Sequence, residues 1–439
     1  MIPERLDALK TWALDNLASP RNAGLVVRNG WAVCQWANEA TRPDVLVEIK
    51  SAAKAFMILC VGLAIQEGRS PAGLPPLEYD SAAYDYIPEG WPLSDPRKAR
   101  VTVRQLMHHV AGILPECTGV PNTPIGSREL WEFTLGMGAY PTARLYAEPG
   151  TKFLYGTYDM RHLCLVLQGA TGQELDDFIR DRILDPCGIE RWRMDRHGGN
   201  GHTGPHADFR MYTTAAEFAR LGYLMLAGGK WTDRQILPDE LMDETFTHRF
   251  PGIVPDHFTY HWLGKHPAWP DVIPDDLFYT FGAGVNICAV VPSLDLVFAR
   301  VGDAYGADHS QATRDLFVRL FSAVEGAPEA PTDTSPPQVA VTSPTDGTSV
   351  SGEVEIRGMA DDEDEIARVE VDIDGAGDPR PAAGTTGWSY DWDTRTVVDG
   401  PHRIVVRAYD RAGNVSRGGR PVLVVVANGG SDPSRRLCG

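Results

Sequence analysis

Ser51 and Lys54 are the residues of this chain whose types and spacing most directly suggest chemistry. They stand three positions apart at the start of a stretch rich in Ala, Leu and Met, which is typical of a helix running from Ser51 to a closing Gly68. Residues at i and i+3 lie on one helix face, so a hydroxyl and an amine meet beside free backbone N–H groups. A desolvated lysine can take the serine proton. The pattern predicts acyl transfer by Ser51.

A purely structural explanation of the same pair is that Ser51 caps the helix and Lys54 is a solvated residue of its first turn. A pattern with two fixed positions is weak by itself. Two observations favour chemistry: the sequence contains no second Ser-x-x-Lys, and this one opens its most apolar helix. These residues alone leave both explanations open.

The composition describes a globular protein with more than one domain. The 439 residues are 43% hydrophobic and 23% charged. A chain of this length is too long to fold around one small core, so two or more domains are expected. The formal net charge of −18 disfavours binding to nucleic acid or to an anionic membrane. The longest apolar run, 55–65, is too short to span a bilayer, and the first residues show no signal peptide.

Cysteine and histidine spacing predicts neither a metal nor a cofactor. The seven cysteines are scattered without a C-x-x-C pair, which favours free buried thiols. His202 and His206 have ligand-like spacing but lie among glycines, so a polar loop is expected there. The acidic run 361–365 could bind Ca²⁺, although a solvated loop is the simpler interpretation.

The pattern of residues 1–325 predicts one domain that opens with a pair of strands, continues with helices and returns to strands. Residues 4–18 form an amphipathic helix, and 22–36 form two strands around a tight Asn29-Gly30 turn. The segment 277–301 is typical of two strands joined by a turn at 292–295. The returning strands must join the first pair in one antiparallel sheet, with the Ser51 helix packed on it. Further helices are expected over 101–112, 154–188, 213–229 and 309–324.

A change in composition and in the pattern of apolar residues marks a second domain. Residues 326–337 are rich in Pro, Ala, Thr and Asp, which indicates a linker. From 338 to 427, short stretches of alternating apolar and polar residues separated by turn signals predict a β-sandwich. The Gly-, Ser- and Arg-rich tail 428–439 is expected to be flexible.

Several segments, taken in order, resemble the penicillin-recognising serine hydrolases, which include class C β-lactamases, D-alanyl-D-alanine carboxypeptidases, family VIII carboxylesterases and aminohexanoate-oligomer hydrolases. The resemblance covers about residues 5–325. It implies an α/β (α+β) fold of the β-lactamase/transpeptidase type: an antiparallel sheet flanked by helices, plus an all-helical subdomain. Residues 338–427 resemble a bacterial Ig-like β-sandwich. The matching segments are Ser51-Ala-Ala-Lys54, Leu106–Gly112, Pro149–Thr157, Met211–Gly222, and Phe278–Asn286 followed by Val291–Val297.

The resemblance implies roles for further residues. In this family a tyrosine at the position of Tyr155 shares a proton with the lysine and delivers it to the leaving group. The oxyanion hole would consist of the backbone N–H groups of Ser51 and Ala283, with Gly282 and Gly284 allowing close approach of the strand. His108 and His109 suggest a Ser-His-Asp triad, but in this family their segment is structural.

Two departures from the family pattern bear on the substrate. The family's Tyr-x-Asn is here Tyr155-Gly156-Thr157, and its Lys-Thr-Gly or His-x-Gly strand is Thr280-Phe281-Gly282. The cation that would hold a substrate carboxylate is therefore missing at that position. A β-lactam or a D-alanyl peptide carries such a carboxylate, whereas a simple ester does not.

The sequence thus predicts a serine hydrolase that acts on carboxylic esters through an acyl-enzyme. Two alternatives stay open: a β-lactam or D-amino-acid peptide or amide hydrolase, including one for aminohexanoate-type linear amides, and a catalytically silent binding protein. The expected ligand is a small ester or amide, and the Ig-like module is expected to contact a surface or another protein. Such modules usually sit on exported proteins, whereas buried cysteines suit a reducing compartment; we expect export, with the cytoplasm as the alternative.

Overall fold

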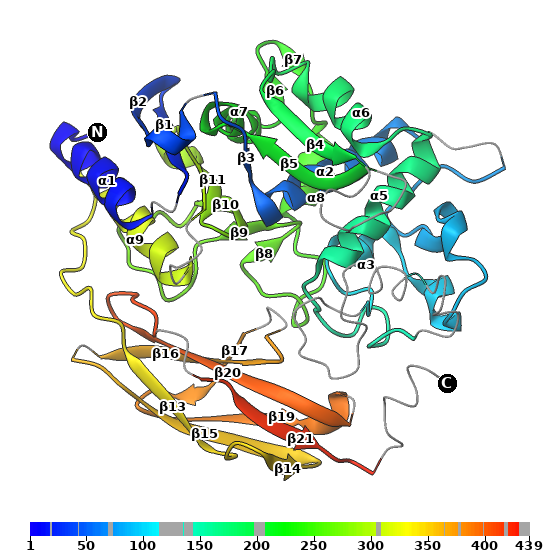
Figure 1. The fold of residues 1–439 in the computed structure, drawn as a ribbon, viewed down its shortest axis with the longest axis vertical. Helices are drawn as coiled ribbons and strands as arrows, with labels where there is room; N and C mark the ends of the chain where they lie inside the picture. Colours follow the sequence, from blue (N-terminus) through cyan, green and yellow to red (C-terminus); the bar gives the residue numbers. More distant parts are fainter. Residues whose placement is uncertain are drawn as a thin grey trace.

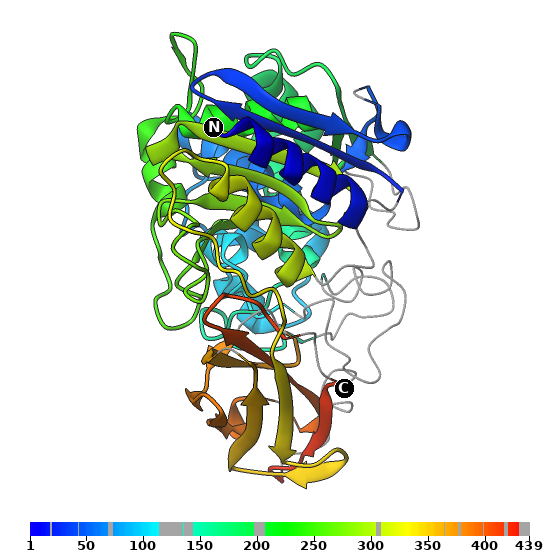
Figure 2. The ribbon, with the colours of Figure 1, turned by 90° about the vertical axis from the view of Figure 1, so that its left-hand side faces the viewer.

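Two domains lie one below the other in the computed structural model of the chain (Figure 1). The first domain runs from blue to yellow-green in the figure, and the second from yellow to red. Both lie in the same order after a quarter turn (Figure 2). The structure describes residues 1–17, 20–42, 44–68, 73–113, 135, 144–196, 207–303, 309–363, 365–375, 379–397, 399–416 and 420–429. The predicted polar loop with His202 and His206 lies outside these ranges.

An antiparallel sheet forms the centre of the first domain. Strand β1 pairs with β12 from Asn22↔Gly302 to Arg28↔Leu296, so the first strands join the last ones across the helical middle of the domain, as the sequence predicts. The turn between the first two strands has Asn29 and Gly30 at positive φ. Within the described residues the strand order is β2 (Trp31–Ala37), β1 (Asn22–Arg28), β12 (Leu296–Gly302), β11 (Asn286–Val291), β10 (Phe278–Gly282), β9 (Trp262–Gly264) and β8 (Phe258–Thr259).

The prediction of two strands over 277–301 is wrong, because the structure has three strands there. The expected first strand folds back on itself, and Gly282 pairs with Asn286 across a turn of three residues. Gly284 and Val285 in this turn have φ of +86° and +60°. Glycine adopts such angles without strain, but valine does not. The predicted turn at 292–295 is confirmed as a 3₁₀ helix, Pro292–Leu294, followed by Asp295.

Two helices cover one face of the sheet. Helix α1 (Pro3–Asn16) and helix α9 (His309–Ser322) lie side by side over it (Figure 2). Leucines of α1 and aromatic residues of α9 share one apolar core with Val26 and Phe298 of the strands. Hydrophobic burial of this kind contributes about 25 cal/mol per Å² of apolar surface. These helices therefore fix the sheet from the side opposite the Ser51 helix.

The apolar helix predicted after Ser51 is α2 (Ala53–Glu67), preceded by a 3₁₀ turn at Lys50–Ala52. It is buried from Ala53 to Ala64 and ends at Gly68 in the left-handed region, as predicted. It touches the sheet near its start, where the Phe56 ring contacts Trp262 of β9. Other helices surround its body: α5 (Thr157–Thr171), α6 (Leu175–Ile179) and α8 (Asp239–Phe246).

The remaining helices follow the predictions with shorter bounds. The segment 101–112 contains a single short helix, α3 (Val103–Met107), with a capping box of Thr102 and Gln105. Helix α7 (Ala215–Leu226) is capped by Thr214, and α6 continues as a π-helix over Arg180–Leu184. Among the described residues, short 3₁₀ helices also lie at Glu39–Thr41, Ala83–Tyr86, Pro88–Gly90 and Pro96–Arg100. No helix in the described ranges is long and apolar enough to cross a membrane.

Two small sheets of the first domain have no counterpart in the predictions. Strand β3 lies directly before the Ser51 turn, and its pairing with β5 fixes the approach of the chain to that turn. Short or irregular strands of this kind carry little alternation for a sequence pattern to show. The strands are β3 (Val47–Glu48), β5 (Ala207–Thr213) and β4 (Trp192–Arg196) in one sheet, and β6 (Lys230–Trp231) and β7 (Arg234–Gln235) in the other.

The second domain is a β-sandwich, as predicted. Its core is formed by alternating inward residues, including Ile356, Val371, Trp388, Trp392 and Val406. One sheet has the order β13 (Gln338–Ser343), β15 (Glu353–Asp361), β19 (Gly387–Asp393) and β18 (Ala383–Gly384); the other has β14 (Thr348–Val350), β21 (Val422–Val426), β20 (Gly400–Asp410), β16 (Ile366–Ile373) and β17 (Arg380–Pro381). A 3₁₀ helix spans Thr394–Thr396.

Specific polar and aromatic contacts join the two domains. The amide of Gln311 in α9 donates to Asn414 at 3.0 Å and accepts from the backbone N–H of Val415 at 2.7 Å. The ring of His266 stacks on Tyr409 with centroids 4.6 Å apart. A cavity of about 550 Å³ between the domains is lined by residues of both. The two domains therefore contact each other directly, in addition to being joined by the linker that the sequence predicts at 326–337.

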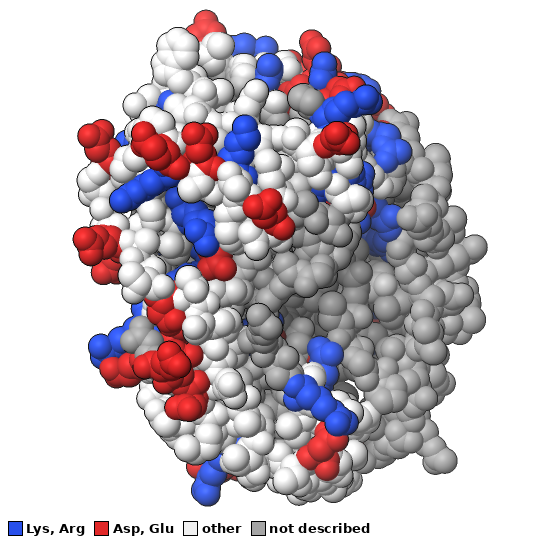
Figure 3. Space-filling view, turned by 60° about the vertical axis from the view of Figure 1, so that its left-hand side comes forward, with Lys and Arg blue, Asp and Glu red and all other residues white. Residues whose placement is uncertain are grey.

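Charged side chains are mixed on the face shown in Figure 3. Lys and Arg lie among Asp and Glu over the described residues of this face. The net charge of −18 is therefore not gathered there into one acidic patch.

Candidate active site

Ser51 lies in the 3₁₀ turn that opens α2, where the preceding residue is conformationally strained. Lys50 has φ of +56°, which costs a non-glycine residue about 1–3 kcal/mol. The turn is held from both sides: the Lys50 ammonium pairs with Glu48, and Ile49 N–H donates to Met211 O at 3.0 Å. Ser51 itself is half-buried. The local fold thus presents the hydroxyl at a fixed point on the edge of the core.

Lys54 joins the two other predicted catalytic residues. Its side chain is 1% exposed, and its Nζ donates to Ser51 Oγ at 2.6 Å and to Tyr155 OH at 3.3 Å. The ammonium also lies 4.9 Å from the centroid of the Tyr155 ring. Three groups that can hold or pass a proton therefore meet within hydrogen-bonding distance, although Tyr155 is 101 residues from Lys54 in the chain.

Strand β10 contacts the Ser51 turn closely. A Cβ added to Gly282 would lie 2.0 Å from Ile49 O and 3.1 Å from Ala52 N. The hydroxyl of Thr280, which is fully buried, donates to Ala52 O at 3.1 Å. Thr280 therefore links the strand to the helix start, and glycine at 282 permits the approach.

The turn that carries Ala283 is held by two buried side chains. The Asn286 amide donates to Ala283 O at 2.7 Å. Arg300 Nη1 donates to Gly284 O at 2.7 Å and to Val285 O at 2.8 Å. Burial lowers the pKa of Arg300 to about 9, because the guanidinium is removed from water; the nearby Asp303 charge opposes this shift. A buried arginine therefore stabilises a turn whose valine is strained.

Thr157 stands at the first position of α5, two residues after Tyr155, with a half-buried side chain. It therefore lies on the same short segment as the predicted proton carrier. The structure thus brings Ser51, Lys54 and Tyr155 together directly, and places Gly282 against the turn before Ser51.

A buried chain of polar residues behind Tyr155 was not predicted. His109 contacts Asp159 through Nδ1 at 3.2 Å, and its Nε2 meets Nε2 of His261. The rings of His109 and Tyr155 have centroids 4.9 Å apart. A Ser-His-Asp triad with His109 is not formed among the described residues, where the ring nitrogens of His109 contact Asp159, His261 and Gly156 instead of Ser51. Asp159 and His261 had no sequence signal, because the three residues come from distant segments.

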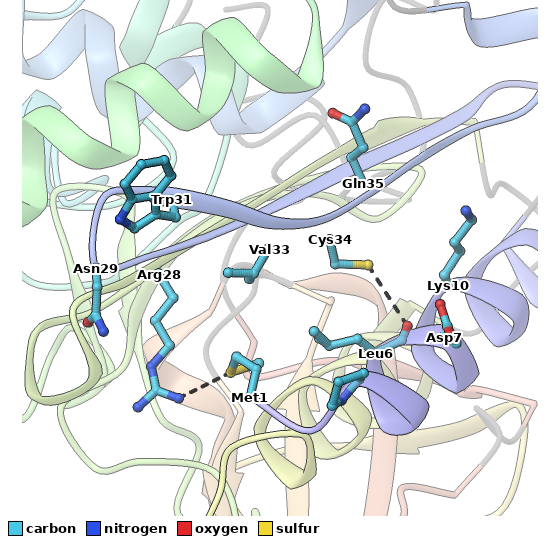
Figure 4. A pocket seen from close by; sticks show the side chains of 11 residues that line it. Met1, Leu6, Asp7, Lys10, Arg28, Asn29, Trp31, Val33, Cys34 and Gln35 are labelled. Atoms are coloured by element: carbon cyan, nitrogen blue, oxygen red, sulfur yellow. Dashed lines mark hydrogen bonds between the residues drawn. The ribbon is translucent and has the colours of Figure 1, made fainter.

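A cavity at the sheet edge is separate from this site. It has a volume of about 620 Å³, lies between α1 and the edge strand β2, and is lined by residues such as Leu6, Arg28 and Trp31 (Figure 4). Ser51, Lys54 and Tyr155 are not among its lining residues.

One group of carboxylates in the described residues has spacing suitable for a metal ion. Oxygens of Asp333, Asp362 and Asp410 lie within 4.8 Å of one another. Asn414 Nδ2 already donates to Asp410 at 2.8 Å and to Asp333 at 3.2 Å, so the amide occupies two of these oxygens. The group lies at the junction of the domains. It includes Asp362 of the acidic run 361–365, for which the sequence leaves a solvated loop and a Ca²⁺ site open.

Comparison with known proteins agrees with this fold. Residues 17–320 match the family described as Beta-lactamase, and residues 337–406 match the family described as Bacterial Ig domain. Among curated proteins, no sequence matches the chain.

Solved structures resemble the chain at low sequence identity. A putative 6-aminohexanoate-dimer hydrolase from Bacillus anthracis is 18% identical, with a TM-score of 0.57 over 73% of this chain and 83% of the other. A penicillin-binding protein homolog from Caulobacter crescentus is 17% identical, with a TM-score of 0.55 over 74% and 99%. EstCE1, a hydrolase with promiscuous acyltransferase activity, is 15% identical, with a TM-score of 0.53 over 74% and 98%.

These likenesses concern the fold of the first domain. The family match itself covers most of the chain, from the first strands to α9. The chain therefore belongs to the β-lactamase family of serine hydrolases and carries a bacterial Ig domain behind the hydrolase fold.

Proposed function

We propose that the protein hydrolyses carboxylic esters through an acyl-enzyme on Ser51. The observation that supports this most directly is the position of the buried Lys54 Nζ, 2.6 Å from Ser51 Oγ and 3.3 Å from Tyr155 OH. A serine needs a neighbouring base to become a nucleophile, and a third group must protonate the leaving alcohol. This arrangement offers both.

The proposed reaction has two halves. In its neutral form Lys54 Nζ takes the proton from Ser51 Oγ while the oxygen attacks the ester carbonyl. The backbone N–H groups of Ser51 and Ala283 stabilise the oxyanion that forms. The C–O bond to the alcohol then breaks as Tyr155 OH gives its proton to the alcohol oxygen and receives one from Lys54. In the second half, water attacks the acyl carbon and its proton passes to the same pair. The bond between the acyl carbon and Ser51 Oγ then breaks, and the proton returns to Ser51 Oγ as the acid leaves.

An uncharged ester suits the surroundings of this site better than a substrate with a carboxylate. Thr280 and Phe281 stand where the family places a cation, and the Thr280 hydroxyl is bound to Ala52 O. Arg300, on the next strand but one, is fully buried and donates to four oxygens of the protein. Beside Tyr155 lies an apolar cluster that includes Phe153 and Phe258. Desolvating a carboxylate there without a partner would be costly.

Amide hydrolysis is the second candidate within the same chemistry. The likeness to the putative 6-aminohexanoate-dimer hydrolase from Bacillus anthracis supports it, although that likeness concerns the fold. Thr157 replaces the asparagine that the family uses to bind an amide, which favours the ester. A binding protein without activity is the third candidate.

We propose that the protein is exported to the periplasm or the cell exterior, with the cytoplasm as the alternative. The Ig domain supports this, because modules of this kind usually belong to exported proteins. The same domain would contact a surface or another protein.

A fluorophosphonate probe together with p-nitrophenyl acetate and butyrate tests the proposal. The wild type should be labelled once and should hydrolyse both esters, and Ser51→Ala should abolish both signals. Ser94→Ala is the matched control, because Ser94 also accepts a hydrogen bond from a buried lysine, Lys98, at 2.8 Å. Labelling that survives Ser51→Ala in a folded protein would refute the assignment. An unlabelled wild type without activity would favour the binding protein.

A further inference from the structure

His109 holds the backbone on both sides of Tyr155. Its carbonyl accepts from the backbone N–H of Leu154 at 2.8 Å, and its Nδ1 accepts from the backbone N–H of Gly156 at 3.4 Å. Its ring lies against the Tyr155 ring, with centroids 4.9 Å apart. His109 also has φ of +57°, in the left-handed region that few residues other than glycine adopt. Strain of this kind persists where the surrounding structure imposes it, and it collects at functional sites.

The hydrogen bonds of His109 determine where its proton lies. Gly156 N–H is a donor, and its contact at 3.4 Å assigns Nδ1 as the acceptor nitrogen and Nε2 as the nitrogen that carries the hydrogen. His109 Nε2 then donates to His261 Nε2, so the hydrogen of His261 lies on its Nδ1. Asp159 Oδ2, at 3.2 Å from the same Nδ1, can form a hydrogen bond to it only as a protonated acid that donates. This arrangement leaves all three side chains neutral.

Burial and the neighbouring lysine favour the same protonation state. Burial lowers the pKa of His109 and of His261 well below the usual range, and the Lys54 charge lowers both further. Burial raises the pKa of Asp159 well above its usual range, against the opposing effects of its own backbone N–H and of the Lys54 charge. No other described residue donates a hydrogen bond to Oδ1 of Asp159, and a buried oxygen without a donor costs less in a neutral acid than in a carboxylate.

We propose that Asp159, His109 and His261 form a neutral, proton-ordered chain whose function is to position Tyr155 against Lys54. The proposal rests on the proposed function, in which Tyr155 carries a proton. The groups that face His109 are Lys54, Tyr155, Asp159, His261 and the neighbouring His108. Because these three side chains are neutral, they place no positive charge beside Lys54 when Lys54 holds the proton of Ser51. Because His109 is hydrogen-bonded at both ring nitrogens, it holds the Tyr155 segment in one place.

The protonation state can be measured without any substrate. Long-range ¹H–¹⁵N spectra of the whole protein with labelled histidine distinguish the two neutral tautomers from the imidazolium. His109→Gln and His261→Gln assign the two signals. We expect the Nε2–H tautomer for His109, the Nδ1–H tautomer for His261, and no titration of either between about pH 5 and 8. An imidazolium signal from either residue at pH 7 would overturn the proposal, whatever the enzyme assay shows.

Variants of Asp159 test the positioning role. Asp159→Asn can still donate to His109 Nδ1, so kcat and its pH profile for p-nitrophenyl butyrate should stay within about threefold of the wild type. Asp159→Leu removes the donor, so kcat should fall by about tenfold to a hundredfold with KM unchanged. A pH profile shifted by Asp159→Asn would mean that Asp159 is ionised, and would contradict the neutral chain.

His108→Phe provides the matched control. His108 is buried beside His109 and packs on Tyr260, but its two nitrogens have no hydrogen-bond partner among the described residues. The His108→Phe variant should keep kcat within about twofold, whereas His261→Phe, which removes the acceptor for His109, should lower kcat about tenfold. If both variants lose the same activity, in proportion to the fall in their melting temperatures, then Asp159, His109 and His261 only pack behind Tyr155 and the proposal is wrong. A wild type without ester activity would refute the proposed function but leave the NMR result standing.

Discussion

Replacing Gly282 by alanine should separate the strand from the Ser51 turn. The added Cβ would lie 2.0 Å from Ile49 O, whereas carbon and oxygen atoms in contact lie about 3.3 Å apart or more. The strand end or the turn must therefore move by about 1.3 Å. Backbone atoms on both sides leave no flexible side chain that could give way. This movement would displace Ala283, whose N–H we propose for the oxyanion hole, relative to the Ser51 hydroxyl.

The expected loss can be estimated from that displacement. A misplacement of about 1 Å at a catalytic site costs about a hundredfold in rate, and forced overpacking costs about 1–3 kcal/mol of stability. Gly282→Ala should therefore lower kcat for p-nitrophenyl butyrate by about a hundredfold and lower the melting temperature. Gly264→Ala in the neighbouring strand is the matched control, since its Cβ would meet nothing nearer than 3.8 Å. Wild-type kcat in a folded Gly282→Ala variant would refute the reasoning about this contact.

Three further predictions follow from the structure. Burial would raise the pKa of Asp95, but hydrogen bonds from Arg97 and Leu145 lower it to about 2, so this carboxylate stabilises the fold above about pH 4 and ceases to do so as the pH falls towards 2. In urea unfolding at pH 7, Asp95→Asn should lower the free energy of unfolding by about 1–2 kcal/mol, and that free energy should then fall less steeply between about pH 4 and 2. The kcat/KM for p-nitrophenyl butyrate should exceed that for nitrocefin by one to two decades or more, because a carboxylate lacks a charged partner worth about 1.5–3 kcal/mol; comparable values would favour the β-lactam alternative. Residues 1–325 alone should stay soluble and hydrolyse esters with a lower melting temperature, because contacts such as His266 with Tyr409 are lost; an insoluble fragment would mean that the domains share a core.

Local patterns predicted the elements that carry the nucleophile. Ser51 and Lys54 belong to one turn of a helix, so their proximity follows from a spacing of three residues. The β-sandwich strands were recognisable because one face is buried and the other is solvated. Tyr155 came from the resemblance to a family, since nothing local connects it to Lys54 at a separation of 101 residues.

Features that depend on distant segments were missed. His109, Asp159 and His261 come from three parts of the chain, and a lone buried histidine has no periodic pattern to reveal it. The fold-back at 283–285 was also missed, because glycine, alanine and valine can continue a strand. The turn depends on Arg300 and Asn286, which hold its carbonyls from another part of the sheet. Such support becomes visible only when the strands are paired.

The segment around His261 connects the Ig-like domain with the candidate active site. On one side, Arg380 of β17 donates to Ile253 O at 2.8 Å and His266 stacks on Tyr409. On the other side, Phe258 packs edge-on against the Tyr155 ring at 6.5 Å, and His261 continues the polar chain behind it. The same short stretch of chain therefore supports the second domain and forms part of the wall behind Tyr155. The Ig-like domain is thus attached next to the proposed proton carrier rather than to a remote surface of the hydrolase domain.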